Sequence, residues 1–401
     1  MSLLSGKKIL LGVSGGIAAY KSPFIVRLFK SHGAEVRVVM TPSAKDFVTP
    51  LTLSTLSDYP VCSTFTEQLY ENPIWNDHVA LGKWADLFLI APATSNTLSS
   101  MVHSKCNNLL IATYLSCTCP VYVAPAMDLD MYAHPANQKN IKELDRIGNK
   151  VLPVGEGFLA SGLNGKGRML EPEEIIDYII KNIKAGLPLK GKKVLITAGP
   201  TYEPIDPVRY IGNYSSGKMG FALAEEALQL GADVILISGP CALEASPYIK
   251  RFSVTSADEM YTLTMEHFST VDIAIAAAAV ADFKPRLVGK QKIKKEVGIQ
   301  SIELDNTQDI LAKMGKLKQK QFLVGFALET EDEKNNAIKK IKSKNLDAIV
   351  LNSLNDSGAG FSLDSNKVTY IQKNETIIPF ELKSKRLVAK DIFSQILIQN
   401  A

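Results

Sequence analysis

The sequence predicts an α/β protein with two parallel sheets. An apolar run at residues 7–13 ends in small residues, and residues 192–200 repeat this plan. Each run precedes a helical stretch and a second apolar run, at residues 33–40 and 231–237, so the chain begins a strand–helix–strand unit twice. The length of 401 residues also favours two domains, because one domain usually has about 100–200 residues.

The boundary between the two domains is expected near residues 184–190. Residues 171–180 predict a helix, because Pro172 suits a first turn and acidic residues follow at the positive end. Glycine and proline after residue 185 end that helix and form a short linker. We therefore expect two Rossmann-like domains, at residues 1–186 and 190–401, each with helices on both faces of a parallel sheet.

Composition excludes several classes of protein. With 46% hydrophobic and 21% charged residues, both domains can bury a core. A net charge of +4 is too small for a dedicated nucleic-acid binder. No apolar run approaches the roughly 20 residues that span a bilayer. The five cysteines lack the spacing of a zinc site and suggest free thiols in a reducing compartment, so we expect a cytoplasmic protein.

Polar residues follow the predicted strands of the first domain, where parallel sheets bind ligands. Gly15, Gly16 and Ile17 form a strand-to-helix turn that suits an anion, although a plain tight turn fits equally. Ser43 follows the second strand, and a polar cluster at residues 94–97 follows the next. Any one of these could be a capped helix start, but we expect all of them at one sheet edge.

Together these motifs resemble the FMN-dependent cysteine decarboxylases over most of residues 1–184. The resemblance rests on the glycine turn, the His78-Val79 step, A-P-A-T-S-N-T at residues 91–97 and P-A-M at residues 125–127. It implies a flavodoxin-like domain in which the flavin oxidises the substrate thiol, CO2 then leaves, and His78 acts as base. The residues implied to bind FMN are Gly15, Gly16, Ile17, Ser43, Thr94, Asn96 and Thr97.

Two catalytic candidates depart from the pattern of that family. Asp128 stands where an asparagine usually contacts the substrate carboxylate, and an ionised aspartate would repel that group. We therefore expect Asp128 to be protonated, neutralised by a partner or used differently. Ser161 stands where a cysteine usually returns a proton, and a hydroxyl is a far weaker acid than a thiol. The proton donor is then Ser161, a water or another group.

The second domain carries a long loop between its first strand and helix, residues 198–220. It contains three prolines, Arg209, Asn213 and Lys218, and it exceeds the usual 2–6 residues of such loops, which favours a role in ligand binding. Small residues around Ala278 would let a flat ring approach the backbone, although close helix packing explains them equally. Lysines crowd residues 290–295; most such runs are solvated, but beside a triphosphate they would supply counter-charge.

These segments closely resemble phosphopantothenate–cysteine ligase across residues 190–352. The shared segments include residues 196–220, A-A-V-A-D at 278–282 and K-I-K-K at 292–295. The resemblance implies that Asn213 stabilises charge on the activated carboxyl, within the motif that holds Arg209, and that Lys292 acts in the cysteine step. Thr307 and Gln308 depart from the usual Asn-Pro. Residues implied to bind the nucleotide are Ala278, Asp282, Asp309, Ile310, Phe326, Lys340 and Lys344.

The two resemblances fit one pathway, because the product of the ligase is the substrate of the decarboxylase. They imply 4′-phosphopantothenate, L-cysteine and CTP as substrates, FMN as cofactor, and Mg2+ or Mn2+ with the triphosphate. They also imply a homo-oligomer, with trimers of the first domain, FMN at subunit contacts, and dimers of the second. We predict no dedicated metal site, no nucleic-acid partner and no membrane partner.

Three alternatives fit parts of the pattern. A nicotinamide dehydrogenase shares the strand–helix start, but G-x-G-x-x-G with a later acid is missing. The first domain could bind flavin without decarboxylating and serve a regulatory role, which Asp128 and Ser161 leave open. It could also resemble the flavin prenyltransferases, although a fused ligase disfavours that.

Overall fold

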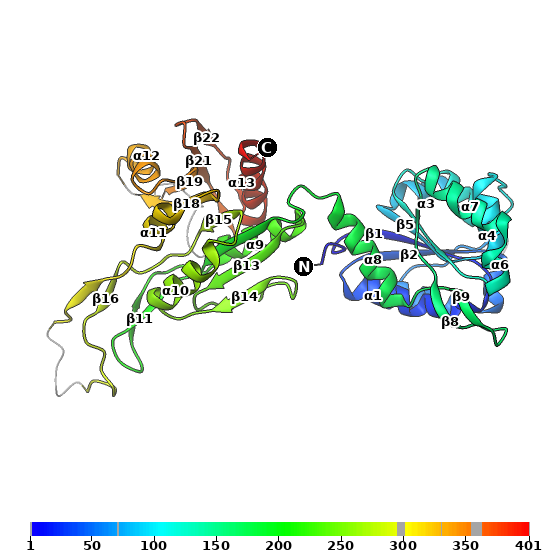
Figure 1. Ribbon diagram of the computed structural model, residues 1–401, viewed down its shortest axis with the longest axis horizontal. Helices are drawn as coiled ribbons and strands as arrows, with labels where there is room; N and C mark the ends of the chain where they lie inside the picture. Colours follow the sequence, from blue (N-terminus) through cyan, green and yellow to red (C-terminus); the bar gives the residue numbers. More distant parts are fainter. Residues whose placement is uncertain (1, 70–71, 295–300, 330, 354–362, 401) are drawn as a thin grey trace. The chain divides into compact units, whose positions relative to one another are not determined.

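The computed structural model describes residues 2–69, 72–294, 301–329, 331–353 and 363–400. The chain divides into two compact units, an N-terminal unit at residues 2–183 and a C-terminal unit from residue 184 onward (Figure 1). Within the described residues, no helix combines the length and apolarity that crossing a membrane requires.

The N-terminal unit is built on a five-stranded sheet in which every pairing is parallel. The strand order is β2-β1-β5-β6-β7, which is 2-1-3-4-5 when the strands are numbered along the chain. This is the flavodoxin-like doubly wound order, so the fold expected for this unit is confirmed. The strands are β1 (Lys8–Val13), β2 (Glu35–Met40), β5 (Leu87–Ala93), β6 (Val121–Pro125) and β7 (Lys150–Val151).

Helices cover both faces of this sheet because its strands are apolar on both sides. Ile9 and Leu11 point into one core, while Leu10 between them points into the other. The first core is covered by α1 (Ser22–Ser31), α2 (Pro50–Ser57) and α8 (Pro172–Ala185). The second is covered by α3 (His78–Trp84), α4 (Ser95–Val102), α5 (Leu109–Leu115) and α7 (Pro135–Arg146).

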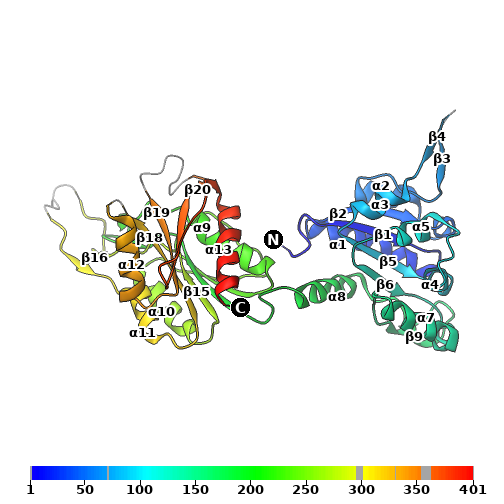
Figure 2. The ribbon, with the colours of Figure 1, turned by 90° about the horizontal axis from the view of Figure 1, so that it is seen from above.

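Two hairpins extend the N-terminal unit beyond its sheet. One pairs β3 (Thr66–Leu69) with β4 (Asn72–Trp75) and projects from the body of the unit (Figure 2). The other pairs β8 (Gly155–Phe158) with β9 (Asn164–Arg168), and β9 packs beside the short helix α6 (Leu129–Ala133). The short helices η1 (Ile17–Lys21) and η2 (Pro42–Asp46) follow β1 and β2.

The C-terminal unit has an eight-stranded sheet in the order β14-β13-β10-β15-β18-β19-β21-β22. Its first six strands are parallel, as predicted, and follow the Rossmann order 3-2-1-4-5-6, whereas the last two are antiparallel. The strands are β10 (Lys193–Ala198), β13 (Asp233–Ser238), β14 (Lys250–Ser253), β15 (Ile273–Ala276), β18 (Phe322–Glu329), β19 (Ala348–Ser353), β21 (Val368–Gln372) and β22 (Ile377–Pro379).

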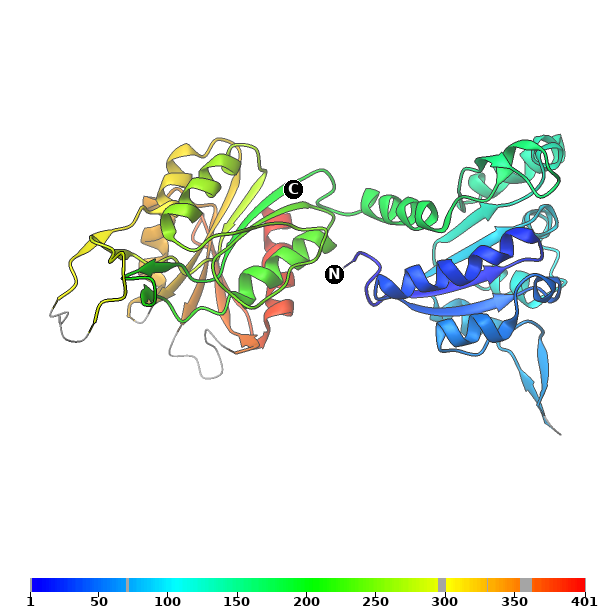
Figure 3. The same ribbon diagram turned by 90° about the horizontal axis from the view of Figure 1, so that it is seen from below.

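Helices again lie on both faces of the sheet. On one face α9 (Lys218–Gln229) packs along α13 (Lys385–Gln399), the green and red helices of Figure 3. The other face carries α10 (Ala257–Phe268), α11 (Ile310–Leu317) and α12 (Glu333–Ser343). Three small two-stranded antiparallel sheets pair β11 (Tyr202–Pro204) with β12 (Tyr210–Gly212), β16 (Phe283–Pro285) with β17 (Leu304–Asn306), and β20 (Ser365–Asn366) with β23 (Lys383–Ser384).

Candidate active sites

A cavity of about 630 Å³ lies at the carboxyl edge of the N-terminal sheet, at the reversal of strand order between β1 and β5. This is the position and size at which such sheets bind small ligands. Its wall is largely apolar, with Tyr20, Met127, Met131, Phe158 and Met169. Five of the seven residues predicted to bind FMN line it, namely Gly15, Gly16, Ile17, Thr94 and Asn96.

The remaining two predicted FMN residues support this wall from behind. Ser43 packs so closely that a Cβ on Gly15 would lie 2.4 Å from its Oγ, which only glycine avoids. Thr97 Oγ1 lies 3.2 Å from Thr94 Oγ1, within hydrogen-bond distance. The Ser14 hydroxyl donates to the carbonyl of Pro92 at 2.7 Å and accepts from the Thr94 N–H at 3.1 Å. These bonds fix the glycine turn to the end of β5.

A buried cation, which sequence analysis missed, borders the same cavity. The Lys21 ammonium donates to the Met169 carbonyl and to the Glu171 carboxylate, both at 2.9 Å, and its side chain is only 3% exposed. Arg168 binds the same carboxylate at 2.8 Å. The hydrogen bond from Lys21 lowers the pKa of Glu171, with Arg168 adding to the effect. Two cations therefore share one anion beside the cavity, and these three groups together carry one positive charge.

Asp128 lines the cavity and begins α6. One of its oxygens accepts the Leu129 N–H at 2.6 Å as a helix cap. The Met127 N–H donates a hydrogen bond to the Gly167 carbonyl at 3.0 Å, and this bond holds the loop that carries Asp128. Among the described residues Asp128 forms no ion pair, although Lys21 and Arg168 line the same cavity.

His78 and Ser161 do not line this cavity within one chain. His78 is the first residue of α3, and its ring packs edge-on against Phe65 and Trp75, with centroids 6.1 and 6.3 Å away. Its Nδ1 atom is buried and has no hydrogen-bond partner in the described structure. Ser161 is exposed in the turn between β8 and β9, one residue beyond Ala160, which does line the cavity.

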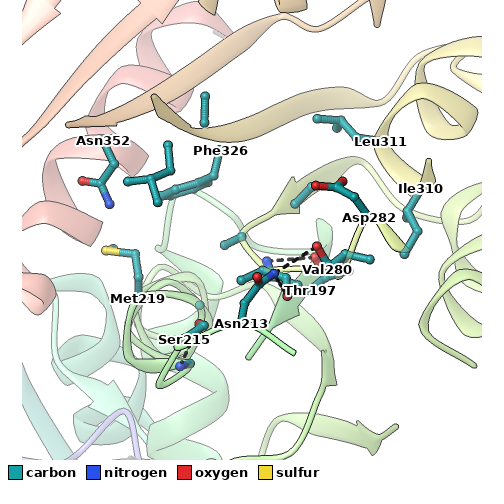
Figure 4. Close-up of a pocket in the computed structure, with 18 of the residues that line it drawn as sticks. Thr197, Asn213, Ser215, Met219, Val280, Asp282, Ile310, Leu311, Phe326 and Asn352 are labelled. Atoms are coloured by element: carbon teal, nitrogen blue, oxygen red, sulfur yellow. Dashed lines mark hydrogen bonds between the residues drawn. The ribbon is translucent and has the colours of Figure 1, made fainter. Parts of the chain in front are cut away.

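A second cavity, of about 600 Å³, lies at the corresponding edge of the C-terminal sheet, between β10 and β15 (Figure 4). Four lysines line it, and the loop at residues 215–217 leads into α9, whose cap Gly217 has φ of +78°. A helix start and several lysines form a site for a polyanion. The four lysines are Lys218, Lys340, Lys344 and Lys385.

Asn213 joins two loops of this cavity. Its side-chain amide donates to the carbonyls of Ala279 and Val280, at 3.1 and 3.2 Å, as the dashed lines of Figure 4 show. Thr307, which departs from the ligase pattern, supports the same turn, because its hydroxyl donates to the Ala281 carbonyl at 2.6 Å. Every predicted nucleotide-binding residue lines the cavity, namely Ala278, Asp282, Asp309, Ile310, Phe326, Lys340 and Lys344.

Ion pairs hold the charged rim of this cavity. Asp309 caps α11 and binds the Lys344 ammonium at 2.6 Å. Burial raises the pKa of Asp309, but the hydrogen bonds from Lys344 and from backbone N–H groups outweigh it, and the pKa is lowered overall. Lys340 pairs with Glu329 at 2.6 Å. A polyanion that displaces these carboxylates would therefore gain two cations already in place.

Arg209 and Lys292 lie outside the lining of this cavity, but Arg209 is hydrogen-bonded to Ile293, the neighbour of Lys292 in the chain. The buried carboxylate of Asp206 accepts from Arg209 Nε at 2.9 Å and from the Ile293 N–H at 3.2 Å. Arg209 Nη2 donates to the Ile293 carbonyl at 2.8 Å. Asp206 and Arg209 therefore hold the segment that carries the exposed Lys292. Lys295 of the same run lies outside the described residues.

We predict that Asp206→Asn lowers ligase turnover about tenfold or more, because a misplaced Lys292 segment loses its alignment. The KM for CTP should change less, since Asp206 does not line the cavity. Steady-state kinetics with each substrate varied would measure this. The hydrogen bond from Arg209 lowers the pKa of Asp206, so its contribution is complete above about pH 4 and is lost only as pH falls through the lowered value.

The control for that prediction is Asp391→Asn. Asp391 lies on α13 and pairs with Lys383 at 2.7 Å, and among the described residues it forms no hydrogen bond to the Lys292 segment. An equal loss of turnover in both variants would contradict the positioning role of Asp206.

Comparison with known proteins assigns the class of both units. Residues 2–184 match the family model described as Flavoprotein, and residues 189–399 match the DNA/pantothenate metabolism flavoprotein C-terminal domain. The chain is thus a two-domain flavoprotein of the pantothenate-metabolism class. The Coenzyme A biosynthesis bifunctional protein CoaBC of Bacillus subtilis is 44% identical over 398 residues, which cover 98% of this chain and 97% of that protein. The chain belongs to the CoaBC family of coenzyme A biosynthesis bifunctional proteins.

Two further similarities concern the whole chain and its second unit. A relative from an unknown prokaryotic organism, named Cysteine/Cysteine sulfinic acid decarboxylase, is 53% identical over 356 residues, covering 87% of this chain and 99% of the relative. The crystal structure of the C-terminal domain of a CoaBC protein is 43% identical and covers 53% of this chain and 98% of that domain, with a TM-score of 0.46.

Proposed function

We propose that the chain catalyses two consecutive steps of coenzyme A biosynthesis. The C-terminal unit would join 4′-phosphopantothenate to L-cysteine with CTP, through an acyl-cytidylate, and release CMP and pyrophosphate. The N-terminal unit would decarboxylate the resulting 4′-phosphopantothenoylcysteine to 4′-phosphopantetheine. The observation that carries this proposal is the pair of cavities at the two strand-order reversals, one apolar with a glycine turn and one lined by lysines.

In the ligase step the lysines would hold the triphosphate, and the small residues around Ala278 would admit the base. Asn213 faces the turn at Ala279 and Val280, where the activated carboxyl would lie, and its amide is the donor proposed to stabilise negative charge there. Mg2+ or Mn2+ would accompany the triphosphate. Among the described residues, the carboxylates that line the cavity are Asp282 and Asp309, so phosphate oxygens and water would complete the ion's ligands.

In the decarboxylase step the N-terminal cavity fits FMN by its chemistry. The apolar wall of Met127 and Phe158 suits a flat ring, and the glycine turn with the Thr94 hydroxyl suits a phosphate. FMN supplies the oxidising equivalents that make the cysteine carboxylate a leaving group. The chain's own part is to hold that carboxylate near Asp128 and to move protons through His78, within a reducing cytoplasm that keeps the substrate thiol free.

A second copy of the chain would complete this site. Apolar side chains stand exposed around the cavity mouth, with Ile17 59% and Phe158 73% exposed. His78 sits instead beside the exposed Trp75 and does not line the cavity of its own chain. Joining these two apolar surfaces would bury both and bring His78 of one subunit to the cavity of another. This supports the expected oligomer with FMN at subunit contacts.

Subunit mixing should test this arrangement. We expect an oligomer of either variant alone to lose decarboxylation. His78→Ala removes the base, and Asn96→Ala removes part of the cavity wall. Mixed by unfolding and refolding together, they should recover a fraction of wild-type activity, since some interfaces would pair an intact His78 with an intact Asn96. CO2 release measures this. No recovery in a mixed oligomer verified by mass would place His78 and the cavity in the same subunit.

The relative named for cysteine and cysteine sulfinic acid decarboxylation suggests a second candidate, in which the N-terminal unit accepts free cysteine. Lys21 and Arg168, which line the cavity, would suit the carboxylate of either substrate. Incubation with L-cysteine alone, without phosphopantothenate or CTP, separates the two. CO2 release at a comparable rate would favour the second candidate, and release only after ligation would favour the first.

The ligase half has its own test. The chain with CTP, Mg2+ and phosphopantothenate should release pyrophosphate without cysteine, and cysteine should then release CMP. Absence of pyrophosphate from folded protein would exclude the proposed activation step.

A further inference from the structure

Two thiols lie together outside both cavities. Cys117 and Cys119 occupy the loop between α5 and β6, at the amino edge of β6, whereas the N-terminal cavity lies at the carboxyl edge of the sheet. Their Sγ atoms are 3.0 Å apart, within hydrogen-bond distance. Both side chains are half-buried and the intervening Thr118 is exposed, so a small reagent can reach them. Neither thiol has a place in the proposed reactions.

The geometry makes the two sulfur atoms unequal. The hydrogen bond from Cys119 lowers the pKa of Cys117 to about 7, and the same bond raises the pKa of Cys119. Cys117 is therefore substantially ionised at neutral pH, while Cys119 keeps its proton. The thiolate is the nucleophile in thiol–disulfide exchange, so Cys117 would react first.

A soft-metal or zinc role is less well supported. The described residues contain no group of three or more histidine, cysteine or acidic side chains placed to hold a metal ion. A disulfide needs only the pair itself. Its sulfur atoms would have to approach from 3.0 Å to about 2.05 Å, which side-chain rotation can supply.

We propose that Cys117 and Cys119 form a redox-active dithiol that reduces low-molecular-weight disulfides and is converted to an intramolecular disulfide. The Cys117 thiolate attacks one sulfur of the small disulfide, forms a mixed disulfide and expels the first thiolate. Cys119 then attacks the Cys117 sulfur, releases its proton and expels the second thiolate. In sum, two protein thiols become one disulfide while one small disulfide becomes two thiols, a transfer of two electrons.

The test uses the full-length chain with oxidised glutathione at neutral pH. Trypsin releases residues 106–139 as one peptide, so the exposed Cys106 is first replaced in a Cys106→Ser parent. After oxidation, alkylation and digestion, mass spectrometry should find this peptide lighter by two hydrogen atoms and unalkylated. A reducing agent should restore two alkylation sites. Circular dichroism melting confirms that each variant is folded.

Two variants of that parent establish the order of attack. Cys119→Ser should accumulate a glutathione adduct on Cys117, because the resolving thiol is gone. Cys117→Ser should form an adduct on Cys119 about threefold more slowly, because the backbone N–H at position 119 still lowers the pKa of Cys117 in one variant and the charge of Asp86 still raises that of Cys119 in the other. Two outcomes contradict the proposal. In the first, both thiols of the Cys106→Ser parent can still be alkylated under conditions in which oxidised glutathione fully modifies Cys106 of the unsubstituted chain. In the second, the parent keeps a stable glutathione adduct instead of forming the disulfide. These readouts do not depend on either proposed enzyme activity.

Discussion

The Asn213→Asp variant is expected to lose about 10²–10³ in kcat/KM for ligation while keeping its fold. Aspartate has nearly the same size but no donor, and its charge would face the carbonyl oxygens of Ala279 and Val280, which the asparagine amide now binds at 3.1 and 3.2 Å. The variant therefore loses both the link between the two loops and the donor proposed to stabilise the activated carboxyl. CMP release under steady-state conditions measures the loss.

The matched control is Asn374→Asp, in the exposed turn between β21 and β22. Among the described residues Asn374 accepts a hydrogen bond only from the Thr376 N–H, at 3.1 Å, so the same change of charge should leave ligation nearly unaltered. If Asn213→Asp kept more than about a third of wild-type kcat/KM, Asn213 would have no role in the chemistry.

Replacing Asp128 with asparagine should raise kcat/KM for decarboxylation about tenfold or more. An ionised Asp128 and a substrate carboxylate about 4 Å apart would repel by about 4 kcal/mol at a dielectric constant near 20. Removing about a third of that energy already raises kcat/KM by a factor of about ten. Asparagine caps a helix as well as aspartate, so the bond from the Leu129 N–H at 2.6 Å would persist. CO2 release at varied substrate concentration measures the change.

Asp130→Asn on the same short helix serves as the control, because Asp130 does not line the cavity. It should leave the rate unchanged. A tenfold fall in Asp128→Asn would instead mean that the carboxyl group itself carries a proton or a contact that the reaction needs.

The sequence predicts the two sheets well because their determinants are local. Apolar strands between helices predict parallel sheets, and glycine turns such as Gly15-Gly16 mark the edge where polar residues collect. The nucleotide cavity follows for the same reason, since each predicted lining residue sits at or just after a strand or on an adjoining helix.

Contacts between distant segments escape this kind of prediction. Arg209 meets Ile293 across 84 positions, and no local pattern indicates that Asp206 would be buried between them. The same holds for Lys21, which binds Glu171 across 150 positions, and for the hairpin that forms within the proline-rich loop. Local patterns also fail to predict that His78 lies away from the cavity of its own chain, because in the proposed assembly it acts at the cavity of another copy.

The most direct test of the two-step proposal is one incubation of the full-length chain with 4′-phosphopantothenate, L-cysteine, CTP and Mg2+, followed by mass spectrometry. The account predicts 4′-phosphopantetheine, with one CMP and one pyrophosphate for each product molecule. Accumulation of 4′-phosphopantothenoylcysteine alone would contradict the decarboxylase assignment. Neither product from folded, flavin-loaded protein would contradict the whole account.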